Sequence, residues 1–135
     1  MPAILFVCVE NSCRSQMAEG FARRLAGPGW TVASAGSHPS GTVHSRAAAF
    51  MKERGIDLAS HRSKGLDELP PITWDAVVTL GCGDACPHVP ARRRIEWDLL
   101  DPKDLPGEDF RRVRDEIDRR VGDLLRDLSP SAASS

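Results

Sequence analysis

The chain of 135 residues contains no tyrosine, and aromatic residues make up only 5% of it. It also has no apolar run near the roughly twenty residues that a membrane-spanning helix needs, and it has no internal repeat. Its net charge is −1, with acids and bases interspersed, so we expect neither nucleic acid nor a membrane as a partner. The one basic cluster, three arginines at 92–94, is typical of a solvated approach to a strand.

A charged leader and a small-residue cleavage site are also missing from the first residues, so we expect a cytoplasmic protein. The length fits one domain, which we expect to span residues 1–128 as a monomer, followed by a flexible polar tail at 129–135. The cysteines stand at positions 8, 13, 82 and 86. In a reducing compartment they indicate catalytic, redox or metal-binding roles more than structural disulfides.

Apolar stretches predict four strands, at residues 3–7, 30–35, 76–80 and 95–97. The segments between and after them have helical periodicity. Strands that alternate with helices favour an α/β fold with a four-stranded parallel sheet and right-handed crossovers. Such sheets bind ligands at the carboxyl ends of their strands.

Three amphipathic helices are expected. The first has an apolar stripe that includes Met17, Phe21 and Leu25, and the second has Ser40 or Thr42 as its N-cap. The last helix has the clearest pattern. Its apolar face is formed by Phe110, Val113, Ile117, Val121, Leu124 and Leu128, and its outer face offers the pairs Asp115–Arg119 and Glu116–Arg120.

Residues 8–15 follow the first predicted strand and combine a thiol, a short loop and an arginine at the start of a helix. Backbone N–H groups of such a loop and the helix N-terminus favour a tetrahedral anion, and the guanidinium of Arg14 fits two of its oxygens. The same positive field favours the thiolate of Cys8, so we predict that Cys8 attacks an oxyanion. Taken alone, Cys8 also fits a buried structural cysteine. The candidate oxyanion-binding residues are Val9, Glu10, Asn11, Ser12, Cys13, Arg14 and Ser15.

Two further features follow predicted strands and should lie on the same edge of the sheet. The glycines around Cys82 and Cys86 leave the backbone free to bring Cys82 first to Cys8 and then to Cys86. Incidental loop cysteines and a four-thiol zinc site are the alternatives, but the spacings fit poorly with the usual two-residue zinc knuckle. Asp101, held by the proline after it, is a better candidate for a general acid than Asp98.

Together these residues resemble the thioredoxin-coupled arsenate reductases of the low-molecular-weight tyrosine phosphatase superfamily, over nearly the full chain. The matching segments are Cys8-Val9-Glu10-Asn11-Ser12-Cys13-Arg14-Ser15-Gln16-Met17-Ala18-Glu19, Ser34-Ala35-Gly36, Lys52-Glu53-Arg54-Gly55-Ile56-Asp57, His61-Arg62-Ser63-Lys64, Asp101-Pro102 and Arg114-Asp115-Glu116-Ile117.

The resemblance implies arsenate reduction by a cysteine relay. Cys8 attacks arsenate, Arg14 and the loop amides stabilise the oxyanion, and Asp101 assists the loss of water. Cys82 then releases arsenite by forming a disulfide with Cys8, and Cys86 moves that disulfide to the flexible loop, where thioredoxin reduces it. Cys13 is expected to be structural, and no cofactor or metal is expected.

The chain departs from the family pattern in three places. Residues 81–84 resemble relatives that use a low-molecular-weight thiol, so such a thiol with its redoxin is the alternative reductant. Lys64 stands where potassium-binding members have an acid, so its ammonium replaces a cation near Asn11 and Glu19. Glu10 adds an acid to the loop, and we expect it to point outward.

Three other functions compete with thioredoxin-coupled reduction. An arsenate transferase differs only in its thiol donor. A phosphotyrosine phosphatase shares the loop, Arg14 and Asp101, but it does not need Cys82, and the chain has Lys103 where that branch has aromatic residues. A non-catalytic thiol or metal sensor would leave Arg14 and Asp101 without a role.

Overall fold

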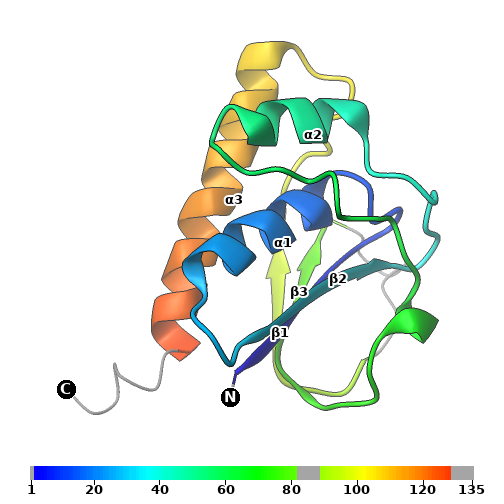
Figure 1. Ribbon diagram of the computed structural model, residues 1–135, viewed down its shortest axis with the longest axis vertical. Coiled ribbons are helices and arrows are strands. Elements are labelled where there is room, and N and C mark those ends of the chain that lie inside the picture. Colours follow the sequence, from blue (N-terminus) through cyan, green and yellow to red (C-terminus); the bar gives the residue numbers. More distant parts are fainter. Residues whose placement is uncertain (1, 82–88, 129–135) are drawn as a thin grey trace.

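One sheet of four parallel strands forms the centre of the molecule, as the sequence predicts (Figure 1). The computed structural model describes residues 2–81 and 89–128. The strands are β1 (Ala3–Cys8), β2 (Thr31–Gly36), β3 (Trp74–Leu80) and β4 (Ala91–Trp97), in the spatial order β2-β1-β3-β4. The predicted tail at 129–135 lies outside the described residues.

The two central strands, β1 and β3, are apolar along most of their length because both faces of the sheet are covered. Side chains of β1 alternate between two cores. One core lies under the helices and contains Ile4 and Phe6, and the other, on the opposite face, contains Leu5 and Val7. All four side chains are at most 1% exposed.

The helices α1 (Arg14–Leu25), α2 (Ser45–Lys52) and α3 (Gly107–Leu128) pack against one face of the sheet. Figure 1 shows them gathered on one side, with the short 3-10 helix η1 (Leu66–Glu68) on the other. The α3 prediction is confirmed for most of its apolar face, since Phe110, Ile117 and Val121 are fully buried. No helix in the described ranges is long and apolar enough to cross a membrane.

Two details of the helices differ from the sequence expectation. Leu25 is 53% exposed, because it ends α1 at an open hollow instead of facing the closed core. The N-cap of α2 is His44, whose Nδ1 accepts a hydrogen bond from the N–H of Arg46, whereas the Ser40 hydroxyl donates to the Thr42 carbonyl.

Charged side chains account for two further differences. The arginines at 92–94 belong to β4 itself and stay exposed, since β4 is an edge strand of the sheet. The expected pair Glu116–Arg120 is present at 2.7 Å. The prediction of an Asp115–Arg119 pair is wrong, because Asp115 accepts hydrogen bonds from Arg54 and Arg114 instead.

Parallel pairing brings three chain segments out of the sheet at one edge. In the register, Val7 is opposite Thr79 and Leu80 is opposite Trp97, so β1, β3 and β4 end almost level. The loop after Cys8 follows β1, Gly81 follows β3, and the loop that leads to Asp101 follows β4. The strand register alone therefore places these segments side by side.

We predict that Phe110→Ala lowers the free energy of unfolding by about 3–5 kcal/mol, because the ring is fully buried and stacks 4.4 Å from the ring of Phe50. Urea denaturation measures this change. Leu100→Ala is the control, since Leu100 is 72% exposed and its removal should change stability by less than about 0.5 kcal/mol. A loss below about 1 kcal/mol at Phe110 would contradict this packing.

Candidate active site

The loop between β1 and α1 turns its carbonyl groups away from a pocket. The carbonyl oxygens of residues 9–13 all accept hydrogen bonds, from the backbone N–H groups of His38, Ser40, His44 and Met17 and from the side chains of Gln16 and Ser63. In the part of the chain that the structure describes, no acceptor is bonded to the N–H groups of residues 10–15. These N–H groups form a cradle for an anion.

Two local features make this loop conformation possible. Asn11 has a positive φ of 52°, and its side-chain oxygen accepts hydrogen bonds from Gln16 Nε2 and the Lys64 N–H, which hold it in place. Gly36 lets β2 approach closely, since a Cβ atom there would lie 2.6 Å from the Val9 carbonyl oxygen. Any larger residue at position 36 would push the loop away from the sheet.

The cradle encloses a pocket of about 260 Å³. Its lining residues are Cys8, Val9, Glu10, Ser12, Cys13, Arg14, Asp101 and Lys103. Asn11 and Ser15, which the sequence also predicts as oxyanion-binding, are not part of this lining. The Asn11 side chain donates a hydrogen bond to the Ser15 hydroxyl, which contacts the Cys8 sulfur.

The Cys8 sulfur, in a residue that is 4% exposed, lies 2.8 Å from the Ser15 hydroxyl oxygen. That oxygen accepts a hydrogen bond from Asn11 Nδ2 at 2.8 Å, so its own proton is free to point at the sulfur. The Ser15 hydroxyl can therefore donate a hydrogen bond to the Cys8 sulfur. The arrangement therefore favours Cys8 as a nucleophile.

Behind Asn11 lies a buried carboxylate, Glu19, 3% exposed. Its Oε1 accepts a hydrogen bond from Ser34, which in turn accepts one from Asn11, and it lies 3.5 Å from the Lys64 ammonium. Burial raises the pKa of Glu19, but Ser34, Lys64 and Arg23 outweigh burial, so its pKa is lowered and it stays ionised. The Lys64 ammonium thus lies beside Glu19, and the backbone N–H of Lys64 donates to Asn11, the other residue near which the sequence predicts it to replace a cation.

The surroundings of Cys13 disfavour ionisation of its thiol. Burial, the Asp101 carboxylate and Cys8 raise the pKa of the Cys13 thiol to about 12. Arg14 and Arg46 act in the opposite direction but do not compensate. Cys13 is therefore a neutral thiol at the start of α1, which agrees with the structural role expected from the sequence.

The guanidinium of Arg14 is held at the pocket by its outer nitrogens. Its Nη1 donates to the Leu99 carbonyl at 2.9 Å, and its Nη2 lies 3.8 Å from Asp101 Oδ2. Its buried Nε has no hydrogen-bond partner among the described residues. Arg14 therefore keeps donors available for an oxyanion, which is the geometry of bidentate recognition.

The loop after β4 supplies two more pocket residues. Asp101 lines the pocket, whereas Asp98 does not. Lys103 also lines it, and its ammonium lies 3.7 Å from the carboxylate of Glu10, another lining residue, whose side chain is 45% exposed. Lys103 is a pocket residue that was not predicted from the sequence, although its position two residues after Asp101 is a signal for it.

Gly81, at the end of β3, touches the same arginine. It has a positive φ of 74°, and a Cβ atom there would collide with the Arg14 guanidinium and lie 2.9 Å from the Leu99 carbonyl oxygen. The next residue in the sequence is Cys82; both Cys82 and Cys86 lie outside the described residues. The segment that carries them thus starts against Arg14.

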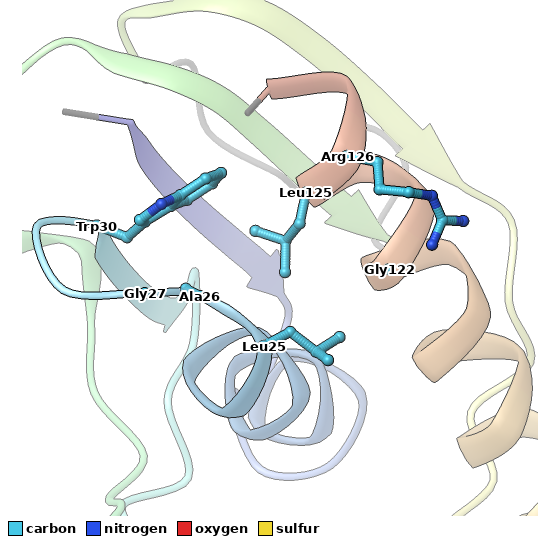
Figure 2. A pocket seen from close by; sticks show the side chains of 7 residues that line it. All are labelled: Leu25, Ala26, Gly27, Trp30, Gly122, Leu125 and Arg126. Atoms are coloured by element: carbon cyan, nitrogen blue, oxygen red, sulfur yellow. The ribbon is translucent and has the colours of Figure 1, made fainter. Parts of the chain in front are cut away.

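A second hollow, of about 350 Å³, lies where α1 and α3 end. Figure 2 shows the side chains of Leu25, Trp30 and Leu125 around it. The described residues that line it include no cysteine, histidine or carboxylate, so none of them is a candidate nucleophile or general acid. Elsewhere in the described ranges, no group of three or more His, Cys, Asp or Glu residues could hold a metal ion.

Comparison with known proteins agrees with this geometry. The family model described as low molecular weight phosphotyrosine protein phosphatase matches residues 3–133. The chain belongs to this family. A relative named arsenate reductase, from Halalkalibacterium halodurans, is 44% identical over 128 residues, which are 87% of this chain and 91% of the relative.

Two solved structures place the chain with the arsenate reductases of this family. An arsenate reductase in the phosphate binding state has a TM-score of 0.84 and 38% identity, with 96% of this chain and 100% of the other covered. A thioredoxin-dependent arsenate reductase from Corynebacterium glutamicum has a TM-score of 0.75 and 31% identity, with 94% and 61% covered. The expected family and α/β fold are therefore confirmed.

We predict that Gly81→Ala weakens the binding of inorganic phosphate about 10-fold or more, because the added methyl group displaces the Arg14 guanidinium. Titration calorimetry measures the dissociation constant. Gly41→Ala is a matched control, since Gly41 also has a positive φ, of 91°, but has open space around its Cβ position. Equal effects of the two substitutions would show that backbone strain, and not Arg14, is responsible.

We also predict that Cys13 resists alkylation at pH 8, where a pKa of about 12 leaves only about 1 thiolate in 10⁴. Iodoacetamide labelling followed by peptide mass mapping distinguishes Cys13 from Cys8, which should react. In urea both should react at the rate of an ordinary cysteine. Labelling of folded Cys13 as fast as in urea would contradict the neutral, buried thiol.

Proposed function

We propose that this chain reduces arsenate to arsenite through a cysteine relay, in which Cys8 is the nucleophile and Cys82 and Cys86 carry the disulfide. The observation that carries this proposal is the Cys8 sulfur 2.8 Å from the Ser15 hydroxyl, beside an amide cradle and an arginine whose Nε has no partner among the described residues. Arsenate is a tetrahedral oxyanion of the kind that such a site stabilises.

In the first step the Cys8 thiolate forms a bond to arsenic, and one arsenate oxygen leaves as water. Arg14 and the N–H groups of the loop neutralise the charge on the remaining oxygens. Asp101, in the pocket wall and 3.8 Å from Arg14, is the group proposed to deliver the proton to the departing oxygen.

In the second step the Cys82 thiolate attacks the Cys8 sulfur. The sulfur–arsenic bond breaks, its electron pair passes to arsenic, and arsenite leaves while a Cys8–Cys82 disulfide forms. Cys86 then attacks Cys82, which restores the Cys8 thiolate and leaves a Cys82–Cys86 disulfide. The contact of Gly81 with Arg14 supports this proposal, because Cys82 is the next residue in the chain after Gly81.

Thioredoxin is the reductant that we propose for this disulfide. The relative from Corynebacterium glutamicum named as thioredoxin-dependent supports that choice. A low-molecular-weight thiol with its redoxin is the alternative, which the glycines around Cys82 favour. Hydrolysis of aryl phosphates is expected as a slow side reaction, because the cradle and Arg14 bind phosphate in the same way as arsenate.

We predict that arsenate drives NADPH oxidation when thioredoxin and thioredoxin reductase are supplied. Cys8→Ser should abolish this activity, because the variant lacks the nucleophile. Cys82→Ser and Cys86→Ser should each reduce steady-state turnover at least 10³-fold, on the order expected for loss of a covalent catalyst. Hydrolysis of a small aryl phosphate by these two variants is the control for an intact cradle.

Normal turnover of both variants with thioredoxin would contradict the relay. Turnover of the variants only with a small thiol would identify an arsenate transferase. Tight, stoichiometric zinc in the purified protein would favour the sensor function instead.

A further inference from the structure

The pocket wall carries a second ion pair that the proposed reaction does not use. Glu10 Oε2 lies 3.7 Å from Lys103 Nζ, and Arg14 Nη2 lies 3.8 Å from Asp101 Oδ2. Both distances exceed the roughly 2.7–3.2 Å of a direct hydrogen bond. Each cation is therefore only loosely held by its acid.

We propose that Lys103 binds the outward oxygen of an inorganic oxyanion and thereby selects inorganic oxyanions over organic phosphate esters, while Glu10 competes with the anion for the Lys103 ammonium. This inference rests on the proposed function, in which arsenate occupies the cradle. It assigns a binding role to Lys103 and a regulatory role to Glu10.

The backbone of Lys103 is fixed on both sides. Its N–H donates to Asp101 Oδ1 at 3.2 Å, and its carbonyl accepts a hydrogen bond from Arg46 Nη1 at 2.7 Å. The Arg46 guanidinium in turn lies 5.0 Å from the centre of the Phe110 ring. The loop is therefore anchored to the helical layer, and only the flexible four-carbon side chain of Lys103 remains free to change partner.

The relative strengths of the two interactions favour transfer of the ammonium to a bound anion. The side chains of Lys103 and Glu10 are 39% and 45% exposed, and an ion pair that is this exposed is weak. A charge-assisted hydrogen bond to a dianion is stronger. Lys103 should therefore leave Glu10 when an oxyanion binds.

The position of Lys103 explains the selection against esters. Lys103 follows Asp101 by two residues, and Asp101 is the proposed proton donor to the departing oxygen. An ester carries its organic group on that oxygen, so the group would have to displace or desolvate the ammonium and the carboxylate. An inorganic oxyanion has a bare oxygen or hydroxyl there, which the ammonium can bind.

Binding of inorganic phosphate to four proteins tests the proposal: the unaltered chain, Lys103→Met, Glu10→Gln and the double variant. Lys103→Met should raise the dissociation constant about 10-fold, and Glu10→Gln should lower it about 3-fold. In the Lys103→Met background, Glu10→Gln should change it less than about 2-fold, because its effect depends on the ammonium. Lys52→Met, an exposed lysine on α2 outside the pocket, is the control and should change nothing.

Steady-state kinetics provide the selectivity readout. Lys103→Met should lower kcat/KM for arsenate about 10-fold and leave kcat/KM for a small aryl phosphate unchanged or raised. An equal loss for both substrates, an unchanged phosphate dissociation constant, or a full Glu10→Gln effect without Lys103 would each overturn the proposal. Phosphate binding needs no reduction step, so an absence of arsenate turnover in all proteins would refute the proposed function and leave the test of Lys103 intact.

Discussion

The outward orientation of the carbonyl groups in residues 9–13 is the constraint on which the site depends. A peptide group whose carbonyl accepts hydrogen bonds from the surrounding chain presents its N–H side to the pocket, and donors from the loop after β2, from α1 and from the segment before β3 fix that orientation. A positive φ at Asn11 and the missing side chain at Gly36 allow it. The candidate anion site is thus built from backbone whose carbonyl groups are hydrogen-bonded to the rest of the chain.

Arg14 links this cradle to the other two segments that leave the same edge of the sheet. Its guanidinium binds the Leu99 carbonyl, faces Asp101 and contacts Gly81. One side chain therefore sets the relative positions of the loop after β4 and the start of the cysteine-bearing segment. Such an arrangement couples the group proposed to bind the oxyanion to the groups proposed to act on it.

A chain of buried hydrogen bonds leads to Cys8, the proposed nucleophile. It runs from Glu19 through Ser34 and Asn11 to Ser15. The carboxylate of Glu19 is offset by Lys64 and Arg23, and its hydrogen bond from Ser34 orients the Asn11 amide toward Ser15. Every member of this chain of contacts is bonded, as buried polar groups require. The Ser15 hydroxyl is left with one proton, and its nearest acceptor is the sulfur of Cys8.

The sequence by itself determined the parallel sheet and the loop after β1, and it predicted that Cys8 and Arg14 belong to one site, because apolar periodicity, the alternation of strands and helices along the chain and the residue types at a strand end can be read locally. It did not determine that Lys103 reaches the pocket, that His44 caps α2 or that Leu25 is exposed. These depend on side chains that are distant in sequence, or on where the helical layer ends. Only the tertiary structure decided them, since the register of β3 and β4 and the packing of α3 set which loops meet at the cradle.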